Sequence, residues 1–502
     1  MEAGIWSLLP AVLAIVLAII TKQVVLSLGA GIIIGALILN GFNPVAAFTS
    51  ITATLIENVA DPEWNTPIIV FCLLLGGIIG MINASKAATA FGNFIARRVR
   101  TQRGGLLTTW FLGVLVFIDD YFNSLSVGAI MRPVSDRLGI SREKLAYTLD
   151  STAAPVCILA PVSTWVAYVM SLLATEFSAA GIDKNPFVAF IELIPYNFYA
   201  LLALVLVVIL AIIGKDYGPM VAAQARTRAS ESEQAETNSS GLLSVLDLLL
   251  PMLSLVLVTL IGMLATGGYF EGGIGIADAF RESDPAMGLI YGGVFSLLFT
   301  IVWYLCRRQP VTRLMEGFGD GFKSMLDPVI ILALAWTIGS VTGELGAGEY
   351  LASVIGANIP AFVLPLLLFA IAGFTGFSTG SSWGTFAIMI PLAVPAAMAV
   401  NPELLMPMLA AVLGGAVFGD HCSPLSDSTI LSSAGAGCNH IDHVSTQLPY
   451  ALTGAAAAAV AFLLAGFGIS PWLALPAGLL VLIALVRFLT TRPAPIQKTL
   501  DS

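Results

Sequence analysis

The sequence predicts an all-α membrane protein that crosses the bilayer about eleven times. Of its 502 residues, 57% are hydrophobic and only 11% are charged, whereas soluble domains average about 25% charged residues. Long apolar runs recur along the whole chain, for example Ile5–Thr21, Phe187–Ile213 and Val245–Ala265, and each is long enough to cross the hydrocarbon core as a helix. No cationic stretch precedes the first run, so we expect a membrane span there and not a cleaved signal peptide.

The basic residues predict how the spans are oriented. Lys and Arg gather in five places, which the positive-inside rule assigns to the cytoplasm. The acidic connections Glu57–Glu63 and Glu271–Asp284 then fall outside. We therefore expect a multi-pass protein of the cell (inner or plasma) membrane, with its N-terminus outside and its C-terminus in the cytoplasm. The five basic clusters are Arg97–Arg103, Arg132–Lys144, Lys215–Arg228, Arg307–Lys323 and Arg487–Lys498.

Three short motifs of the first half recur in the same order in the second half. Their prolines are offset by 261, 258 and 263 residues, and a near-constant offset repeated three times indicates an internal repeat. The motif pairs are "TPIIVF" (Thr66–Phe71) with "DPVIIL" (Asp327–Leu332), "GAIMRPV" (Gly128–Val134) with "FAIMIPL" (Phe386–Leu392), and "APVST" (Ala160–Thr164) with "SPLSD" (Ser423–Asp427).

Charge then predicts the relative orientation of the two repeats. The loops near Arg97 and Arg132 are strongly basic, whereas their counterparts Gly356–Pro360 and Pro395–Glu403 contain no Lys or Arg. Equivalent loops should therefore lie on opposite sides of the membrane. Such an inverted-topology repeat is typical of secondary transporters.

The same charges predict two re-entrant hairpins. Arg103 and Arg132 are both assigned to the inside, yet only 28 residues separate them. A single crossing would put the two arginines on opposite faces, and two crossings need roughly 40 residues. We therefore expect a hairpin that dips to mid-membrane, with its tip at Phe117–Ser124. The repeat predicts a second hairpin with its tip at Gly376–Gly384.

Two further segments are long for one crossing and are interrupted by Pro and polar residues, so we expect broken helices. The expected division of the chain is 1–66 for N-terminal spans of the first repeat; 67–213 for the first repeat core, with hairpin 104–134 and broken helix 144–175; 214–244 for a flexible cytoplasmic linker; 245–327 for opening spans of the second repeat; 328–467 for the second repeat core, with hairpin 360–395 and broken helix 404–436; and 468–502 for an extra C-terminal span and tail.

The chemistry of these interruptions points to a cationic guest. Non-helical backbone at membrane depth is tolerated only where protein buries it or where it lines a wet cavity, so we expect the four interruptions to meet near the midplane. A charge at the bilayer centre costs roughly 2.5–3.5 kcal/mol, and no Lys or Arg occurs in these centres. Neutralisation by Na⁺, H⁺ or an ammonium group is therefore expected. The carboxylates at or near the interruptions are Asp119, Asp120, Asp150, Asp420 and Asp427.

Competition between two ions is a sufficient mechanism for exchange at such a site. Burial raises the pKa of an unpaired carboxyl group, whereas a bound cation lowers it, and hard cations prefer oxygen ligands. Proton and Na⁺ therefore compete for the same groups, and no cofactor beyond these ions is expected. Na⁺ is expected at Asp120, Asn123, Asp427 and Ser428. The full set of candidate ion or substrate ligands is Asp119, Asp120, Asn123, Ser124, Asp150, Ser163, Thr164, Ser378, Thr379, Ser381, Ser382, Asp420, His421, Ser423, Ser426, Asp427, Ser428 and Thr429.

Several of these residues also have purely structural interpretations. Either member of Asp119–Asp120 can cap the second hairpin helix, and Asp150 can bond to a hydroxyl group of a neighbouring helix. His421 can relay protons or simply pack in the interior. His440 and His443 have the spacing of a metal pair, but no third ligand accompanies them, so we expect a solvated loop at the cytoplasmic mouth.

Three tryptophans are expected to serve packing. Trp165, Trp336 and Trp383 are more typical of packed or interfacial residues than of substrate platforms. Glu344 lies near a predicted helix end and is a minor candidate for the site. Whether any histidine senses pH stays open at this point.

The motifs at the interruptions resemble the NhaC family of Na⁺/H⁺ antiporters, within the wider ion-transporter superfamily. They are "FIDDYFNSL" (117–125), "TLDSTAAPVCILAPVSTW" (148–165) and "GDHCSPLSDST" (419–429), and the resemblance spans about residues 67–450. It implies cation-coupled exchange by a homodimer through an elevator-like movement. Relatives also exchange organic acids or amino acids, so fold does not settle the substrate. The residues that the resemblance implicates are Asp119, Asp120, Asn123, Asp150, Ser423, Asp427, Ser428 and Thr429.

Other classes of protein fit the sequence less well. A Na⁺- or H⁺-coupled carrier of a small organic solute is the nearest alternative, and an intramembrane aspartyl protease is a distant one, because its GxGD and YD pairs are absent. A primary pump is disfavoured because no nucleotide-binding loop is present. A passive channel would not need so many titratable acids. We therefore expect a transporter and no enzyme, with lipid and small ions as partners and no nucleic acid.

Overall fold

The regular structure of the protein is helical. The computed structural model describes residues 4–21, 23–87, 99–229, 243–347, 350 and 359–491, and within these ranges it contains no strand. Nine helices in the described ranges are long and apolar enough to cross a membrane, or ten if the bent pair Pro186–Tyr196 and Phe198–Ile213 forms one span. The predicted all-α membrane class is therefore confirmed. The sequence predicted about eleven spans, and the described residues contain nine or ten candidates.

The helices of the first half differ widely in length. The long ones are separated by short helices near the predicted interruptions. In chain order they are α1 (Leu9–Thr21), α2 (Val24–Leu39), α3 (Pro44–Val59), α4 (Asn65–Ser85), α6 (Gln102–Leu115), α7 (Asp120–Arg137), α8 (Arg142–Asp150), α9 (Ala154–Cys157), α10 (Thr164–Ala179), α11 (Pro186–Leu193), α12 (Phe198–Ile213) and α13 (Met220–Ala229).

The second half also mixes long and short helices. Five short 3₁₀ turns of the described chain accompany the α-helices at Ile5–Leu8, Ile194–Tyr196, Tyr269–Glu271, Ala361–Val363 and Pro402–Leu404. The α-helices are α14 (Leu243–Thr266), α15 (Ile276–Arg281), α16 (Pro285–Cys306), α17 (Val311–Ser324), α18 (Leu326–Glu344), α20 (Leu364–Thr379), α21 (Ser382–Val400), α22 (Leu405–Cys422), α23 (Asp427–Ala436), α24 (His440–Gly466) and α25 (Pro471–Thr491).

Local chemistry explains where many of these helices begin. Asn43, Asn185 and Asn439 each accept hydrogen bonds at Oδ1 from backbone N–H groups of the first turn of α3, α11 and α24. Such caps satisfy donors that have no partner inside the helix. Proline occupies the first position of α3 and α11, where its missing N–H removes no helical bond. The helix boundaries are therefore encoded by neighbouring residues.

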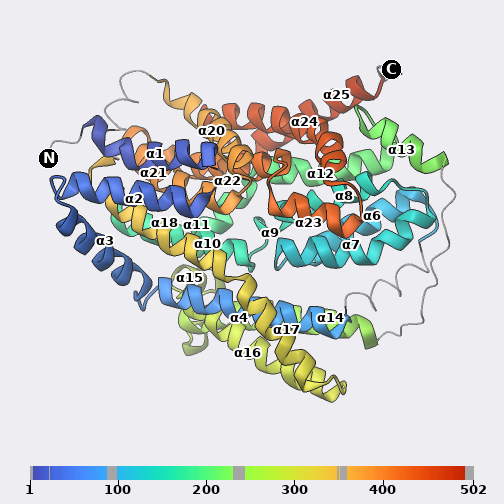
Figure 1. Ribbon diagram of the computed structural model, residues 1–502, viewed down its shortest axis with the longest axis horizontal. Helices are drawn as coiled ribbons and strands as arrows, with labels where there is room; N and C mark the ends of the chain where they lie inside the picture. Colours follow the sequence, from blue (N-terminus) through green and yellow to red (C-terminus); the bar gives the residue numbers. More distant parts are fainter. Residues whose placement is uncertain are drawn as a thin grey trace.

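The helices form groups that Figure 1 separates clearly. Helices α4, α14, α16 and α17 lie along the lower side of the view, and α6, α7, α8 and α23 lie together on the right. Helices α20, α21, α22 and α24 pack in the upper part, with α1 and α2 beside them. The short helix α9 lies between these groups, near the middle of the molecule. Segments from both halves of the chain therefore surround its centre.

Glycines allow a close helix crossing between α4 and α17. A Cβ atom built on Gly80 would lie 1.9 Å from the carbonyl oxygen of Gly317, and one on Gly76 would lie 2.4 Å from that of Gly321. Gly76 and Gly80 are spaced as small-xxx-small, as are Gly317 and Gly321. In lipid, where apolar surface gives little drive for association, this close backbone contact stabilises helix pairs.

Each of the four segments in which we expected an interruption contains one. Non-helical residues separate α6 from α7 at 116–119 and α20 from α21 at 380–381. A longer stretch, 151–163, separates α8 from α10 and contains only the short α9, and residues 423–426 separate α22 from α23. The membrane depth of these points, the re-entrant path and the inverted repeat stay predictions, because the loops at Arg97 and Gly356 lie outside the described residues.

Part of the predicted linker is helical. The sequence predicted a flexible cytoplasmic linker over 214–244, and α13 occupies Met220–Ala229 within it. Gln224 is buried, donates a hydrogen bond from Nε2 to the carbonyl of Gly139 and accepts one at Oε1 from the N–H of Ser141. These contacts tie the start of the polar segment to the loop before α8. Residues 230–242 of the predicted linker lie outside the described residues.

Candidate cation-binding site

The first hairpin and the first broken helix are joined at their interruptions. The N–H of Thr164 donates to the carbonyl of Ile118 at 3.0 Å, and its hydroxyl group donates to Asp119 Oδ2 at 3.2 Å. The other carboxylate oxygen of Asp119 accepts a hydrogen bond from the N–H of Phe122 at 2.9 Å and so caps α7. Asp119 is 3% exposed. Asp119 therefore caps α7, as its structural interpretation expected, and its second carboxylate oxygen accepts the hydrogen bond from Thr164.

Asp120 is buried beside a tryptophan from α10. Its Oδ1 accepts a hydrogen bond from Trp165 Nε1 at 2.9 Å, and the residue is 4% exposed. It lies close enough to Asp119 and Asp420 for the three charges to interact. Trp165, expected to be a packing residue, is therefore a hydrogen-bond donor to a candidate ligand as well. Asp420 belongs to the second half of the chain, so the two halves meet at this point.

Asn123 has an unusual environment one helical turn beyond Asp120. Its Nδ2 lies 2.7, 2.9 and 2.9 Å from the carbonyl oxygens of Gly113, Val116 and Thr152. These carbonyls come from the end of α6 and from the interruption after α8, so one amide fastens both to α7. The buried Oδ1 of Asn123 has no hydrogen-bond partner among the described residues. It is therefore an acceptor that a guest can use.

Asp150 is fully buried and surrounded by donors from the second half. Thr429 donates to its Oδ2 at 3.2 Å and Ser432 to its Oδ1 at 3.5 Å. Gln447 Nε2 donates to Oδ2 at 2.5 Å and also to the carbonyl of His421 at 2.7 Å. The predicted bond between Asp150 and a helix hydroxyl group is therefore present. These contacts join α8 to α23 and α24.

Two histidines lie at the same cluster. His421 Nε2 is 3.1 Å from the backbone oxygen of Asp150, and its Nδ1 is 3.2 Å from the hydroxyl group of Tyr199. His443 is fully buried, with Nε2 3.5 Å from Asp150 Oδ2, although neither ring nitrogen forms a hydrogen bond with a described residue. His421 is therefore held in place, whereas His443 is close to a carboxylate without a fixed bond.

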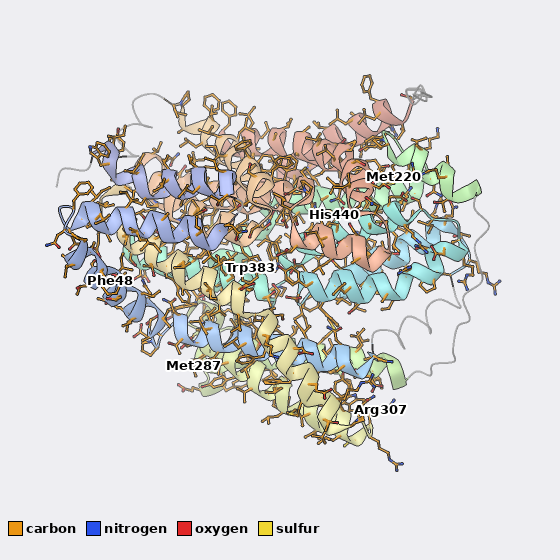
Figure 2. The ribbon with its side chains drawn as sticks, in the orientation of Figure 1. Phe48, Met220, Met287, Arg307, Trp383 and His440 are labelled. Carbon is orange, nitrogen blue, oxygen red and sulfur yellow. The ribbon has the colours of Figure 1, made fainter. Side chains whose placement is uncertain are left out.

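The expectation of a solvated loop around His440 and His443 is wrong. Asn439 caps α24, so His440 and His443 lie on its first turn and not in a loop. His440 is 3.1 Å from the hydroxyl group of Ser433 and 2.7 Å from the carbonyl of Pro424, and Figure 2 shows it beside α23. His443, three residues later, faces inward. The segment is rich in polar residues, which are typical of loops, and for that reason the start of α24 was not predicted.

Asp420 is buried at the end of α22 and has few donors. Ser428 donates to its Oδ2 at 3.3 Å, and Ser426 and Ser428 are linked at 3.0 Å. The hydroxyl group of Ser382, at the start of α21, lies beside the same carboxylate without completing a hydrogen bond. Asp420 is 4% exposed. It is therefore a buried acid with spare acceptor capacity that faces hydroxyl groups.

Asp427 differs from the other four acids because it is exposed. Tyr121, next to Asp120 on α7, donates from its hydroxyl group to Asp427 Oδ2 at 3.1 Å. Of the four residues expected to hold Na⁺, Asp120 and Asn123 are buried on α7, Ser428 is bonded to Asp420, and Asp427 lies at the edge of the cluster. The four therefore do not form one enclosed set of ligands.

The second hairpin reaches the cluster through its tip. Gly380 ends α20 with φ +67°, and a Cβ atom there would lie 2.6 Å from the backbone of Leu425 in the second broken helix. The ring of Trp383 packs edge-on against Trp165, and its carbonyl accepts a hydrogen bond from Tyr168 at 3.0 Å. Figure 2 shows Trp383 near the middle of the molecule. In chain order, the first and second interruptions are therefore in contact, as are the third and fourth, and residues at the starts of the following helices join the two pairs.

The remaining predicted hydroxyl groups are mostly engaged in local structure. Ser163, Ser381 and Ser426 each cap the helix that follows them, and Ser423 accepts a bond from the N–H of Leu425. Thr379 donates to its own helix at Thr375. Ser124 bridges to α23 by accepting a bond from Ser432 at 3.1 Å, and Ser378 is half-buried. The candidate set thus contains both helix caps and cluster residues.

Three residues in the cluster were missed by sequence reasoning. Tyr121 and Ser432 contact acids directly, and Gln447 holds the carboxylate of Asp150. Gln447 carried a usable signal, since it is an uncharged polar residue at the start of an apolar run. The other two had none, because tyrosine and serine occur throughout these segments.

The electrostatics of the cluster are one-sided. Asp119, Asp120, Asp150 and Asp420 are at most 4% exposed. Among the described residues no Lys or Arg forms an ion pair with any of them, and their hydrogen-bond donors are hydroxyl, amide, indole and backbone N–H groups. In the described chain, the basic side chain closest to their carboxylates is His443, 3.5 Å from Asp150. The described residues also contain no group of three or more His, Cys, Asp or Glu side chains that could hold a metal ion by themselves.

Interrupted helices that meet around buried acids, in a chain rich in apolar spans, define the class of polytopic membrane ion transporters. The profile of the Na⁺/H⁺ antiporter family matches residues 156–467, which is more than half of the chain. The protein therefore belongs to the Na⁺/H⁺ antiporter family. The resemblance found in the motifs is thereby confirmed.

Individual relatives match to different extents. An uncharacterised protein of Haemophilus influenzae is 41% identical over 97% of this chain and 96% of its own length. The malate-2H⁺/Na⁺-lactate antiporter of Bacillus subtilis is 30% identical over 31% of this chain and 33% of its own. The Na⁺/H⁺ antiporter NhaC of Alkalihalophilus pseudofirmus is 29% identical over 30% of this chain and 32% of its own. This chain thus shares only about a third of the length of the two named antiporters.

A solved structure has a similar fold. The YdaH transporter of Alcanivorax borkumensis superposes with a TM-score of 0.55 over 84% of this chain and 89% of its own, at 15% sequence identity. At that identity the likeness concerns the fold alone.

Proposed function

We propose that the protein exchanges Na⁺ (or Li⁺) for H⁺ across the membrane, and that the two ions compete for the carboxylates of Asp120 and Asp420. The observation that carries this proposal is the burial of four acids, none of which forms an ion pair with a Lys or Arg among the described residues; only the carboxylate of Asp150 has a histidine, His443, within 3.5 Å. A buried anion is stable only when a cation pairs with it or a proton neutralises it. Binding of one ion therefore displaces the other.

The hydrogen bonds support a division of roles among the acids. Asp150 already accepts bonds from Thr429, Ser432 and Gln447, which suits a group that joins the two halves. Asp120 and Asp420 each accept one side-chain bond and keep acceptor capacity for a cation. Ser428, Ser382 and Asn123 Oδ1 supply further oxygen atoms of the kind that hard cations prefer. In this proposal Asp427 attracts cations at the edge of the cluster.

Flux into reconstituted proteoliposomes tests the proposal. Addition of Na⁺ alone should collapse an imposed pH gradient in the wild type, and Asp120→Asn and Asp420→Asn should abolish that response. Asp278→Asn is a matched control, because Asp278 is an exposed acid paired with Arg281. Direct ²²Na⁺ binding to the purified variants separates loss of binding from loss of movement. Gradient collapse by Na⁺ in either buried-acid variant would contradict the assigned role.

A carrier of an organic solute is the second candidate. The relative of Bacillus subtilis is named as a malate and lactate antiporter, which favours an organic substrate for part of the family. Among the described residues no Lys or Arg pairs with the four buried acids of the cluster, which argues against a dicarboxylate, whereas an ammonium group would still fit. If the pH gradient collapses only when malate, lactate or an amino acid is added with Na⁺, this second function holds and simple exchange does not.

The membrane setting is part of the proposal. We infer a cell-membrane protein with its N-terminus outside, its C-terminus in the cytoplasm and a homodimeric assembly. The positive-inside pattern of Arg132–Lys144 and Arg307–Lys323 supports the orientation. Accessibility of single cysteines placed in these two segments to an impermeant reagent, in intact cells and in inverted vesicles, tests it.

A further inference from the structure

A second acidic region lies away from the central cluster, where three helices end together. The C-terminal ends of α10, α18 and α21 surround a cavity of about 910 Å³. Each helix C-terminus carries a partial negative charge of roughly half a unit. Two acids, Glu176 and Glu344, line the cavity, and none of the described lining residues is basic. The cavity is therefore negative from both its backbone and its side chains.

Glu176 is the residue that singles out this cavity. It is 7% exposed, lies on the last turn of α10 and borders the cavity. Its carboxylate forms no hydrogen bond or ion pair with any residue that the structure describes. Its Oε1 lies against the backbone of Gly339, where a Cβ atom would approach to 2.8 Å. A buried acid without a donor needs a partner from outside the protein.

The cavity walls suit a small hydrated cation better than an anion. The hydroxyl groups of Ser340 and Thr342 donate to carbonyl groups of their own helix. Ser340 also accepts a hydrogen bond from Asn58 Nδ2 at 3.2 Å, so one lone pair of Ser340 and both of Thr342 remain available as acceptors. The remaining walls are formed by small and apolar residues such as Ala179, Pro395 and Met398. Among the described lining residues, acceptors and negative charge converge, and no basic side chain lies opposite Glu176. An organic acid would meet repulsion here.

Glu176 is also connected with the central cluster through α10. It follows Trp165, the donor to Asp120, by eleven residues, which is close to three helical turns, so both side chains lie on one face about 17 Å apart along the axis. By the positive-inside assignment, this end of α10 and the loop near Met398 both face outward. The cavity thus lies on the outer side of the cluster, in line with it.

We propose that this cavity is a second cation site, in which Glu176 binds Na⁺ and concentrates it before it reaches the central carboxylates. The inference rests on the proposed exchange of Na⁺ for H⁺, and it assigns the outer step of that exchange. A cavity lined by negative charge raises the local concentration of cations and their rate of entry. Glu344, which is exposed, contributes less because solvent and salt screen it.

A labelling experiment tests the site without relying on transport. Met398→Cys is introduced into a full-length background in which Cys306→Ser and Cys438→Ser remove the two cysteines that are not buried. A cationic methanethiosulfonate reagent should label Cys at position 398 about tenfold faster than an anionic one of similar size. Glu176→Gln should bring the two rates close together. Na⁺ should slow cationic labelling more than choline at equal ionic strength.

Transport supplies the second readout. In proteoliposomes, Glu176→Gln should raise the KM for Na⁺ roughly three- to tenfold and leave kcat nearly unchanged, because entry and not exchange is affected. Glu176→Asp should restore most of the affinity. Glu271→Gln, an exposed acid on the same predicted face that does not line the cavity, is the control and should match the wild type.

The two readouts separate failure of this site from failure of the proposed function. A charge preference in labelling that Glu176→Gln leaves intact would overturn the site, and so would equal protection by choline and Na⁺. An unchanged KM in a variant that transports normally would remove the recruiting role. If the wild type shows no Na⁺/H⁺ exchange but labelling depends on Glu176 and Na⁺, the cation site holds and the proposed function fails.

Discussion

The hydroxyl group of Tyr121 lies 3.1 Å from Oδ2 of Asp427, a residue 306 positions later in the chain. The contact joins the first turn of α7 to the first turn of α23 and borders the buried acids on one side. A carboxylate at the start of a helix is favoured by the helix dipole, so Asp427 is held by two stabilising influences. This single hydrogen bond therefore links the first hairpin to the second broken helix.

The first prediction concerns that bond. Tyr121→Phe and Asp427→Asn should each weaken Na⁺-dependent transport by a few fold, and the double variant should be little worse than either one. The coupling should be about 1 kcal/mol, or roughly fivefold, because the carboxylate is exposed and water competes for it. Initial rates in proteoliposomes across a double-mutant cycle measure it. Fully additive losses would show that the two side chains act independently.

The second prediction concerns the buried acids. Asp420→Asn should remove the increase in thermal stability that Na⁺ gives the wild type, because ligand stabilisation requires a binding site. Without Na⁺, the same variant should be at least as stable as the wild type, since it no longer buries an acid that lacks a basic partner. Thermal unfolding in detergent, with Na⁺ or choline, measures both effects. A Na⁺-dependent shift that survives in Asp420→Asn would place the ion elsewhere.

The third prediction concerns a buried ion pair near the predicted cytoplasmic end. Lys144 Nζ lies 2.7 Å from Asp216, both side chains are less than a tenth exposed, and Tyr450 donates to the same carboxylate at 2.8 Å. Lys144→Met should lower stability by about 3–5 kcal/mol, because it leaves a buried charge without its partner. Lys144→Met combined with Asp216→Asn should recover much of that loss. Unfolding midpoints of the three proteins test this, and an undiminished loss in the double variant would refute it.

The fourth prediction concerns the crossing of α4 and α17. Gly80→Ala should reduce folded yield and stability strongly, because the new methyl group would lie 1.9 Å from the carbonyl oxygen of Gly317. Gly319→Ala on the same α17 should be neutral or slightly stabilising, since no atom lies within 4 Å of the position that its methyl group would take and alanine is the better helix former. Size-exclusion yield and thermal unfolding compare the two. If both variants behaved alike, α4 and α17 could move apart at this crossing without loss of stability, and the prediction would be wrong.

The class of protein and the location of the interruptions could be predicted from the sequence alone. Apolar runs must be helical in lipid, because no water is available there to satisfy the backbone. Polar and Gly- or Pro-containing segments within such runs therefore marked where helices stop, and local caps such as Asp119 and Ser426 are readable from neighbouring residues. The acids were identified as candidates for the same reason, since charge inside a membrane segment is rarely incidental.

Only the tertiary structure decided which of these residues meet. The sequence grouped Asp120 with Asp427, whereas packing brings Asp120 near Asp420 and leaves Asp427 exposed. Contacts between helices far apart in the chain decide three further features. They bury His443 beside Asp150, place the amide of Gln447 on the carboxylate of Asp150, and form the cavity at Glu176. Periodicity and charge constrain a segment by itself, but the depth and rotation of one helix against another follow from side-chain packing, which no local pattern specifies.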